Sequence, residues 1–314
     1  MSLSYLGRRV LIAMFSLWAA ITILFAMIHL VPGDPVSAIL GDAYTERAAT
    51  ALRAQLALDR PLPVQYVTYL GSILTGDLGT SYISRQPVMG EVLGNFGFTL
   101  RLALAGLAVS VLLGIPLGFI AALRRGRLAD IAAMTVAVLG VSMPGFWLGI
   151  LLMVIFAVQL GWFPLIGIGN EGDVVDIGRH LVLPAVTLGM RGAGLIARVT
   201  RSALLETLNQ DYVRTARAKG VHDRTVVVAH ALRNAMLPIV TVAGLDLGRM
   251  LGGTTVIETV FSRPGTGVLL IQAVLTRDYP MIQAAFLLFL TVIIVINLLV
   301  DVLYARLDPR VVYA

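Results

Sequence analysis

Long unbroken runs of apolar residues set the first limit on what this chain can fold into. Each run extends for about 20 residues, the length that an α-helix needs to cross the hydrocarbon core of a bilayer. Of the 314 residues, 58% are hydrophobic and 13% are charged, whereas roughly 25% of the residues of a soluble domain are charged. A membrane β-barrel would instead show short segments of alternating polarity. The sequence therefore predicts an all-α membrane protein.

Six segments are apolar enough to be transmembrane helices. They are predicted near 10–31, 99–123, 131–159, 181–203, 237–257 and 283–305. The first follows Arg8 and Arg9, lacks a small-residue cleavage site and is too long for the core of a signal peptide, so we expect it to be retained as an anchor. The connection 32–98 is rich in turn-forming stretches such as "PGDP" and "GDLG", which predict a small folded external loop.

The distribution of Arg and Lys over the short connections predicts the orientation, because basic residues predominate in cytoplasmic loops. The basic residues fall on one side of the predicted membrane: Arg8 and Arg9, the stretch 124–130, the stretch 198–233, and Arg306 and Arg310. Both termini are therefore expected in the cytoplasm. The connection 160–180 contains Glu171, Asp173 and Asp176 but one basic residue, Arg179, and is expected outside.

One connection is unusually rich in charges and contains the only lysine of the chain: "DYVRTARAKGVHDRTVVVAHALRNAMLP", residues 211–238. Asp211 is a favourable N-cap, and Gly220 suits the left-handed position that follows a helix, so 212–219 is predicted to form two helical turns. Asp223 is expected to cap a second helix, which runs toward Pro238 and the next span.

This connection has the features of a docking surface. Tyr212, Ala216 and Gly220 are four residues apart and share one helical face, which Arg214 and Arg217 flank. A solvated loop that merely obeys the positive-inside rule is the alternative. A DNA-binding helix-turn-helix is disfavoured, because such a unit has a third helix and a core of its own, whereas both ends of this connection run into membrane.

The connection resembles the cytoplasmic coupling loop of binding-protein-dependent ABC transporter permeases. Arg214, Thr215, Ala216 and Gly220 fall on the Glu-Ala-Ala-x-x-x-Gly positions of that loop. Arg214 replaces the acidic first residue, and Pro238 lies later than in the general pattern. Both departures are similar to what the dipeptide, oligopeptide and nickel branch of the family shows. The chain also resembles this branch, in the same order, in the stretches "LALDRPLPVQY", "LGVSMPGFWLGI", "VIETVFSRPGTG" and "RDYPMIQA".

The resemblance implies a single permease domain over 1–314, the first of two permease subunits in a bacterial inner-membrane importer. A second, homologous permease subunit would complete the pore, an external solute-binding protein would deliver the solute, and two cytoplasmic ATPase subunits would bind the ATP. Residues implied to couple to the ATPases are Asp211, Tyr212, Arg214, Thr215, Ala216, Arg217, Lys219 and Gly220. The implied solutes are dipeptides or oligopeptides, while nickel chelates, glutathione and opine-like conjugates stay open.

The chain is not expected to be an enzyme. It contains no G-x-x-x-x-G-K-[ST] loop to hold ATP phosphates, so no cofactor is expected in this chain. The stretch "GVSMPG" departs from the G-x-S-x-G pattern of serine hydrolases, and the histidines show no metal-ligand spacing. Besides membrane lipid, only protein partners are expected, and no nucleic acid. A stand-alone secondary transporter or channel is the rival function, although no inverted repeat is visible.

Three charged residues, Arg191, Asp246 and Arg249, fall inside predicted spans, where each charge costs about 2.5–3.5 kcal/mol. Asp246 and Arg249 are three residues apart on a helix and can form an ion pair. Alternatively, the three residues line a hydrated cavity that suits a zwitterion such as a short peptide. In the branch that the chain resembles, the corresponding positions look like an uncharged residue, Gln and Gly, so these three are candidate residues of the substrate pathway.

Overall fold

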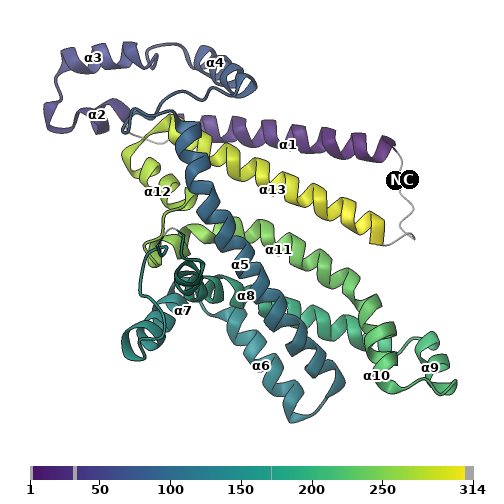
Figure 1. Ribbon diagram of the computed structural model, residues 1–314. Coiled ribbons are helices and arrows are strands. Elements are labelled where there is room, and N and C mark those ends of the chain that lie inside the picture. The colour runs from purple at the N-terminus through teal and green to yellow at the C-terminus, as the bar shows by residue number, and fades with distance from the viewer. Residues whose placement is uncertain (1–2, 31–33, 171, 308–314) are drawn as a thin grey trace. The chain divides into compact units, whose positions relative to one another are not determined.

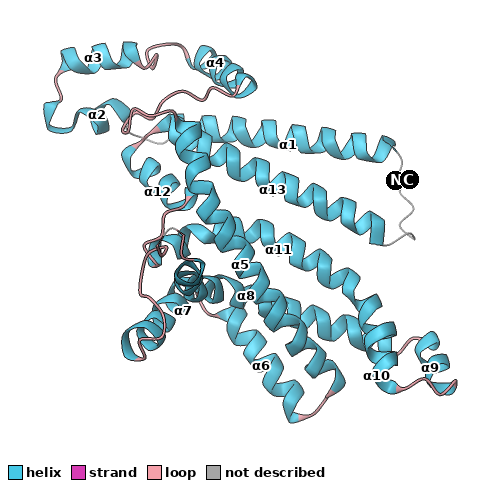
Figure 2. Cartoon of the chain, viewed as in Figure 1, coloured by secondary structure: helices cyan, strands magenta, loops and turns pink. Residues whose placement is uncertain are grey.

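The computed structural model describes residues 3–30, 34–170 and 172–307. The predicted span end at residue 31, Glu171 and Arg310 lie outside these ranges. Within them the chain forms helices joined by loops (Figure 2). The only strand-like feature of these residues is an isolated bridge between Thr80 and Pro87. The predicted all-α class is confirmed.

Within the described ranges, five helices are long and apolar enough to cross a membrane, or six if one bent pair is a single span. The five are α1 (Leu3–Leu30), α5 (Val88–Leu123), α8 (Val174–Leu208), the continuous helix formed by α10 (Asp223–Thr225), η3 (Val226–Leu232) and α11 (Arg233–Val260), and α13 (Tyr279–Leu307) (Figure 1). The bent pair is α6 (Leu128–Ser142) with α7 (Gly145–Leu152) and its π-helical continuation η2 (Met153–Gln159).

Several helices extend beyond the apolar segments that predicted them. The helix α5 begins at Val88 and not near 99, and the helix that contains 237–257 begins at Asp223. Polar residues support helical hydrogen bonds as well as apolar ones do, so hydropathy marks the apolar part of a helix and not its ends.

The described residues divide into two compact units. Unit 1 comprises 100–170, 172–263 and 295–307, and unit 2 comprises 3–30, 34–99 and 264–294. In unit 2, the region predicted as a folded loop contains α2 (Pro35–Leu40), η1 (Gly41–Ala43), α3 (Glu46–Gln55) and α4 (Leu62–Thr75). A further helix of this unit is α12 (Thr266–Thr276). The side chains of Asp34 and Thr45 cap α2 and α3, as expected for these residue types.

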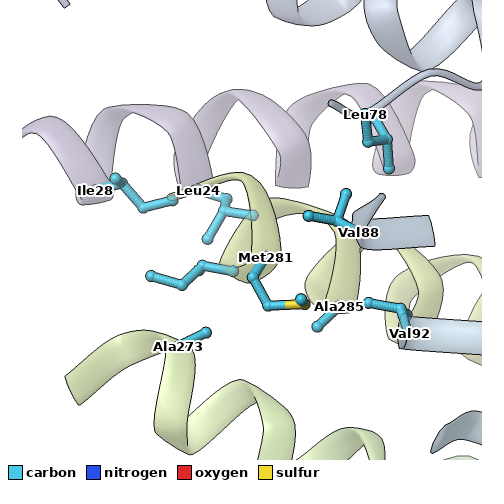
Figure 3. Packing of buried hydrophobic residues seen from close by; sticks show 10 residues of the cluster. Leu24, Ile28, Leu78, Val88, Val92, Ala273, Met281 and Ala285 are labelled. Carbon is cyan, nitrogen blue, oxygen red and sulfur yellow. The ribbon is translucent and has the colours of Figure 1, made fainter. Parts of the chain in front are cut away.

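The core of unit 2 joins segments that are far apart in the sequence. Figure 3 shows side chains from α1, the loop after α4, the start of α5, α12 and α13 that pack together: Leu24, Ile28, Leu78, Val88, Val92, Ala273, Met281 and Ala285. The carboxylate of Asp278 accepts hydrogen bonds from the Ser81 hydroxyl and, at 3.1 Å, from the Tyr82 N–H. Burial raises the pKa of Tyr82 to about 12, and Asp278 contributes to the increase. These contacts fix the turn before α5 to the start of α13.

In unit 1, α8 packs against α5, α6 and α11, and small residues allow the close approach. A Cβ on Gly118 of α5 would lie 2.3 Å from the carbonyl oxygen of Ala197 in α8. A Cβ on Gly194 of α8 would lie 2.2 Å from the carbonyl oxygen of Ala137 in α6. No other residue type fits these positions without moving a backbone.

Candidate functional site

The charged connection forms a short helix, α9 (Asp211–Ala218), followed by a left-handed turn. Gly220 has φ +77°, and its N–H donates to the carbonyl of Arg217 at 2.9 Å, as expected for a glycine that ends a helix. The predicted N-cap is wrong by one residue. Gln210 occupies the cap position, and Asp211 begins the helix, where its carboxylate lies 3.7 Å from Nη1 of Arg214.

The second helix of the connection also begins differently from the prediction. His222 is its N-cap, because Nδ1 accepts a hydrogen bond from the N–H of Arg224 at 3.2 Å. Asp223 is therefore inside the helix, and its carboxylate accepts a hydrogen bond from Nε of Arg217 at 3.0 Å. Pro238 lies within α11 and does not mark the start of a new helix. The ion pair between Arg217 and Asp223 links α9 to α10 across the turn at Gly220.

Buried contacts hold α9 against the helix that follows it, and Figure 1 shows α9 beside α10. Val213 is fully buried, Ala216 is half-buried, and the hydroxyl of Tyr212 accepts a hydrogen bond from Nδ2 of Asn234 at 2.7 Å. The face expected to be open is therefore open only in part, because Ala216 is turned toward the protein. In α9 and the turn that follows it, the exposed residues are Asp211, Tyr212, Arg214, Thr215, Arg217, Ala218, Lys219 and Gly220.

Val213 and Asn234 hold α9 in position, and this role was predicted for neither residue from the sequence. Val213 is the only β-branched aliphatic residue of α9, a local signal that could have identified the buried side. Asn234 is 22 residues from Tyr212, and no spacing rule connects them.

The second candidate site is a cavity of about 540 Å³ in unit 1. It lies at the break between α6 and α7, where the two helices differ in direction by 108°. Pro144 causes the break, since it lacks an N–H and disfavours the helical conformation of the residue before it. Met143 is accordingly extended, with ψ 132°. The remaining walls come from α8 and α11.

All three charged residues predicted inside spans line this cavity. Arg191 is on α8, and Asp246 and Arg249 are on α11. Both arginines are exposed, whereas Asp246 is 6% exposed. Of the two alternatives, the Asp246–Arg249 ion pair is not formed: among the described residues, no basic nitrogen lies within 4.0 Å of the Asp246 carboxylate. The three-residue spacing places Asp246 and Arg249 on one face of α11, but their side chains point in directions that keep the two charges apart.

The carboxylate of Asp246 is instead directed at α8. A Cβ placed on Gly192 would lie 2.1 Å from Oδ2, and this oxygen has no hydrogen-bond partner within the described part of the chain. Two cationic groups and one carboxylate around a cavity can bind a solute that carries both kinds of charge. The described residues include no group of three or more His, Asp or Glu that could hold a metal ion.

The sequence is similar to known membrane components of transport systems. Residues 114–313 match the family described as "Binding-protein-dependent transport system inner membrane component", and residues 2–103 match its N-terminal counterpart. A glutathione transport system permease protein of Salmonella typhimurium is 46% identical over 311 residues, which cover 99% of each chain. A protein of Brucella ovis described as a peptide permease is 46% identical over 98% of this chain and 99% of its own.

Two solved structures share the fold at low sequence identity. The inward-facing MetNI methionine ABC transporter has a chain that is 20% identical, with a TM-score of 0.57, over 71% of this chain and 99% of that chain. An amino acid ABC transporter crystallised with histidines has a chain that is 14% identical, with a TM-score of 0.53, over 70% of this chain and 94% of that chain.

Proposed function

The chain belongs to the family of binding-protein-dependent transport system inner membrane components and is a permease subunit of an ABC importer, and we propose that its solutes are short peptides or glutathione. The similarity to a glutathione permease and to a peptide permease over nearly the whole of each chain carries this proposal. Nickel chelates and opine-like conjugates are less favoured, because neither of these relatives is described as carrying them.

We propose that the permease acts in the bacterial inner membrane with both termini in the cytoplasm. A second, homologous permease subunit completes the pore, and a solute-binding protein delivers the solute from outside. Two ATPase subunits bind and hydrolyse ATP, so this chain supplies no catalytic group and binds no cofactor. Membrane lipid surrounds the spans, and nucleic acid has no role.

The helix α9 and the turn at Gly220 are proposed to couple the permease to an ATPase subunit. This short helix presents exposed charged residues between two long apolar helices, and buried contacts fix it to the second of them. A force applied to α9 therefore acts on α10 and α11, because Arg217 of α9 binds Asp223 of α10 and Tyr212 of α9 binds Asn234 of α11. The coupling residues are Asp211, Tyr212, Arg214, Thr215, Ala216, Arg217, Lys219 and Gly220.

The cavity at the α6–α7 break is proposed to be part of the solute pathway. Arg191, Asp246 and Arg249 line it from two helices that pack against each other, and the bent helix forms its third wall. A half-pore of this kind requires the partner permease to close it, which agrees with the exposure of both arginines in the isolated chain.

Reconstitution into liposomes tests the proposed function. The chain, its partner permease, the two ATPases and the binding protein should together accumulate labelled glutathione or a labelled dipeptide, and uptake should require both ATP and the binding protein. The same liposomes without ATPase subunits serve as the control. Uptake by this chain alone under an ion gradient would instead favour a stand-alone secondary transporter.

A further inference from the structure

The carboxylate of Asp246 lacks the partners that a buried charge needs. An ionised carboxylate removed from water without compensating hydrogen bonds is strongly destabilising. Asp246 is 6% exposed, and its Oδ2 accepts no hydrogen bond within the described residues. The hydroxyl of Ser110, which also faces Gly192, is directed at the backbone carbonyls of Gly106, at 3.0 Å, and Gly189, at 2.8 Å. A donor from outside the chain would complete this site.

Gly192 determines where the carboxylate lies. A methyl group at this position would lie 2.1 Å from Oδ2 of Asp246, 2.4 Å from Oγ of Ser110 and 3.1 Å from Cε of Met250. The carboxylate therefore occupies space that only glycine leaves open on α8. Gly192 is a positioning residue, because it acts on the cavity through the Asp246 carboxylate.

Among the described residues that line the cavity, Asp246, Arg191 and Arg249 are the only charged ones. Two are cationic and one is anionic, so their summed charge is complementary to a solute with one cationic and two anionic groups. The volume of about 540 Å³ lies within the range of roughly 300–1,000 Å³ typical of sites for small molecules.

We propose that Asp246 binds the ammonium group of the solute while Arg191 and Arg249 bind carboxylates, so that the cavity selects short peptides with a free amino group and two carboxylates. Ammonium donates to a carboxylate in a charge-assisted hydrogen bond, and guanidinium binds carboxylate in a planar, two-pronged geometry. This inference rests on the proposed function, and it assigns the solute class and a separate role to each charged residue.

Equilibrium binding to the assembled transporter tests this assignment. The complete permease and ATPase complex is placed in lipid nanodiscs without binding protein, so that the receptor's own selectivity does not enter. The probes are glutathione, which has one ammonium and two carboxylates, and N-acetylglutathione, which lacks the ammonium. The wild-type complex should bind glutathione more tightly, and this comparison needs no variant.

The Asp246→Asn variant should weaken glutathione binding by about tenfold or more, the usual size of a lost hydrogen bond between charged groups. Binding of N-acetylglutathione should stay the same. Arg191→Gln and Arg249→Gln should weaken the binding of both probes. Arg198→Gln is the matched control, because Arg198 is exposed on the same helix as Arg191 and does not line the cavity.

Gly192→Ala should reproduce the selective loss seen with Asp246→Asn, since the added methyl displaces the carboxylate without changing any charge. Gly253→Ala is its control: Gly253 lines the same cavity, and a Cβ there would meet only Cδ1 of Leu188 at 3.5 Å. A merely structural role of Gly192 would weaken both probes equally.

The inference is overturned if Asp246→Asn weakens the binding of both probes equally or changes the binding of neither. It is also overturned if the wild-type complex binds both probes equally. ATP-driven uptake is measured in parallel with the same wild-type complex, reconstituted into liposomes together with its binding protein. If uptake is retained but the two probes are not discriminated, only the role assigned to Asp246 is rejected, and the proposed function stands. Absence of ATP-driven uptake of any peptide would reject the proposed function itself.

Discussion

Arg263 replaces a backbone hydrogen bond that Pro184 removes from α8. A proline lacks the N–H that would bond the carbonyl four residues earlier, so the carbonyl of His180 in α8 is left without its helical donor. Nη1 of Arg263 supplies the missing donor at 3.1 Å and also donates to the carbonyl of Gly167 at 2.8 Å. Burial lowers the pKa of Arg263, an effect that the charge of Glu258 partly offsets. The guanidinium thus joins the end of α11 to α8 and to the loop before it.

We expect Arg263→Met to reduce the free energy of unfolding by about 1.5–3 kcal/mol, the contribution typical of hydrogen bonds from a charged donor. Denaturant unfolding of the purified protein in detergent measures the change. Arg263→Lys should lose less, because it keeps one charged donor. Arg224→Met, at an exposed position of α10, is the control, and equal midpoints for the two methionine variants would contradict a stabilising role.

Gly220 provides the second prediction at this scale. Gly220→Leu should insert and assemble normally but hydrolyse ATP without proportionate uptake, because a bulky side chain at φ +77° both strains the turn and covers the exposed end of α9. The strain alone should cost about 1–2 kcal/mol. Gly126→Leu is the matched control, since Gly126 has φ +75° and, like Gly220, no atom within 4 Å of an added Cβ. Normal coupling in Gly220→Leu would reject this role.

At the scale of elements, α9 is a short helix that depends on its neighbours for its position. Eight residues are too few to be stable as an isolated helix in water. Burial of Val213 and the Tyr212–Asn234 hydrogen bond supply the missing stability, and the Arg217–Asp223 contact fixes the angle at the turn. We therefore expect α9, α10 and α11 to move together.

Val213→Asp should release α9 from this support, because an unpaired carboxylate at a fully buried position costs several kcal/mol. Trypsin should then cleave faster after Arg214 and Lys219, and ATP hydrolysis should no longer drive uptake. Ala218→Asp places the same charge at an exposed position of α9 and should not accelerate cleavage. Equal cleavage rates in the two variants would show that Val213 does not hold the helix.

At the scale of the whole molecule, the bent pair α6–α7 decides the topology. If this pair crosses the membrane, the turn at 124–127 and the connection after α8 lie on the same side, because two crossings separate them. If it is instead a re-entrant loop, only α8 separates them, and they lie on opposite sides. The Arg distribution requires the first arrangement, since both segments are basic.

Accessible tags distinguish the two topologies. A tag inserted at Gly126 and one at Val221 should both be labelled only from the cytoplasmic side, and a tag at Gly172 should be labelled only from outside. Whole cells and inverted vesicles labelled with a membrane-impermeant reagent give the two readings, with a cytoplasmic marker protein as the control for leakage. Opposite labelling of Gly126 and Val221 would establish a re-entrant loop and would remove the topological support for docking of α9 to a cytoplasmic ATPase subunit.

The sequence by itself determined the properties that depend on neighbours along the chain. Apolar runs of membrane-spanning length predicted the helical class, because a backbone in lipid must satisfy its own hydrogen bonds. Gly220 predicted the left-handed turn, since few other residues adopt positive φ at low cost.

Only the tertiary structure decided the contacts between residues that are distant in the sequence. The spacing of Asp246 and Arg249 allowed an ion pair, but packing against α8 turned the carboxylate toward Gly192, which lies 54 positions earlier. The contact between Asn234 and Tyr212 likewise depends on how α9 folds back on the next helix. Helical spacing fixes which side chains can reach each other within one helix, whereas rotamers and interhelical distances are set by the packing of all the helices together.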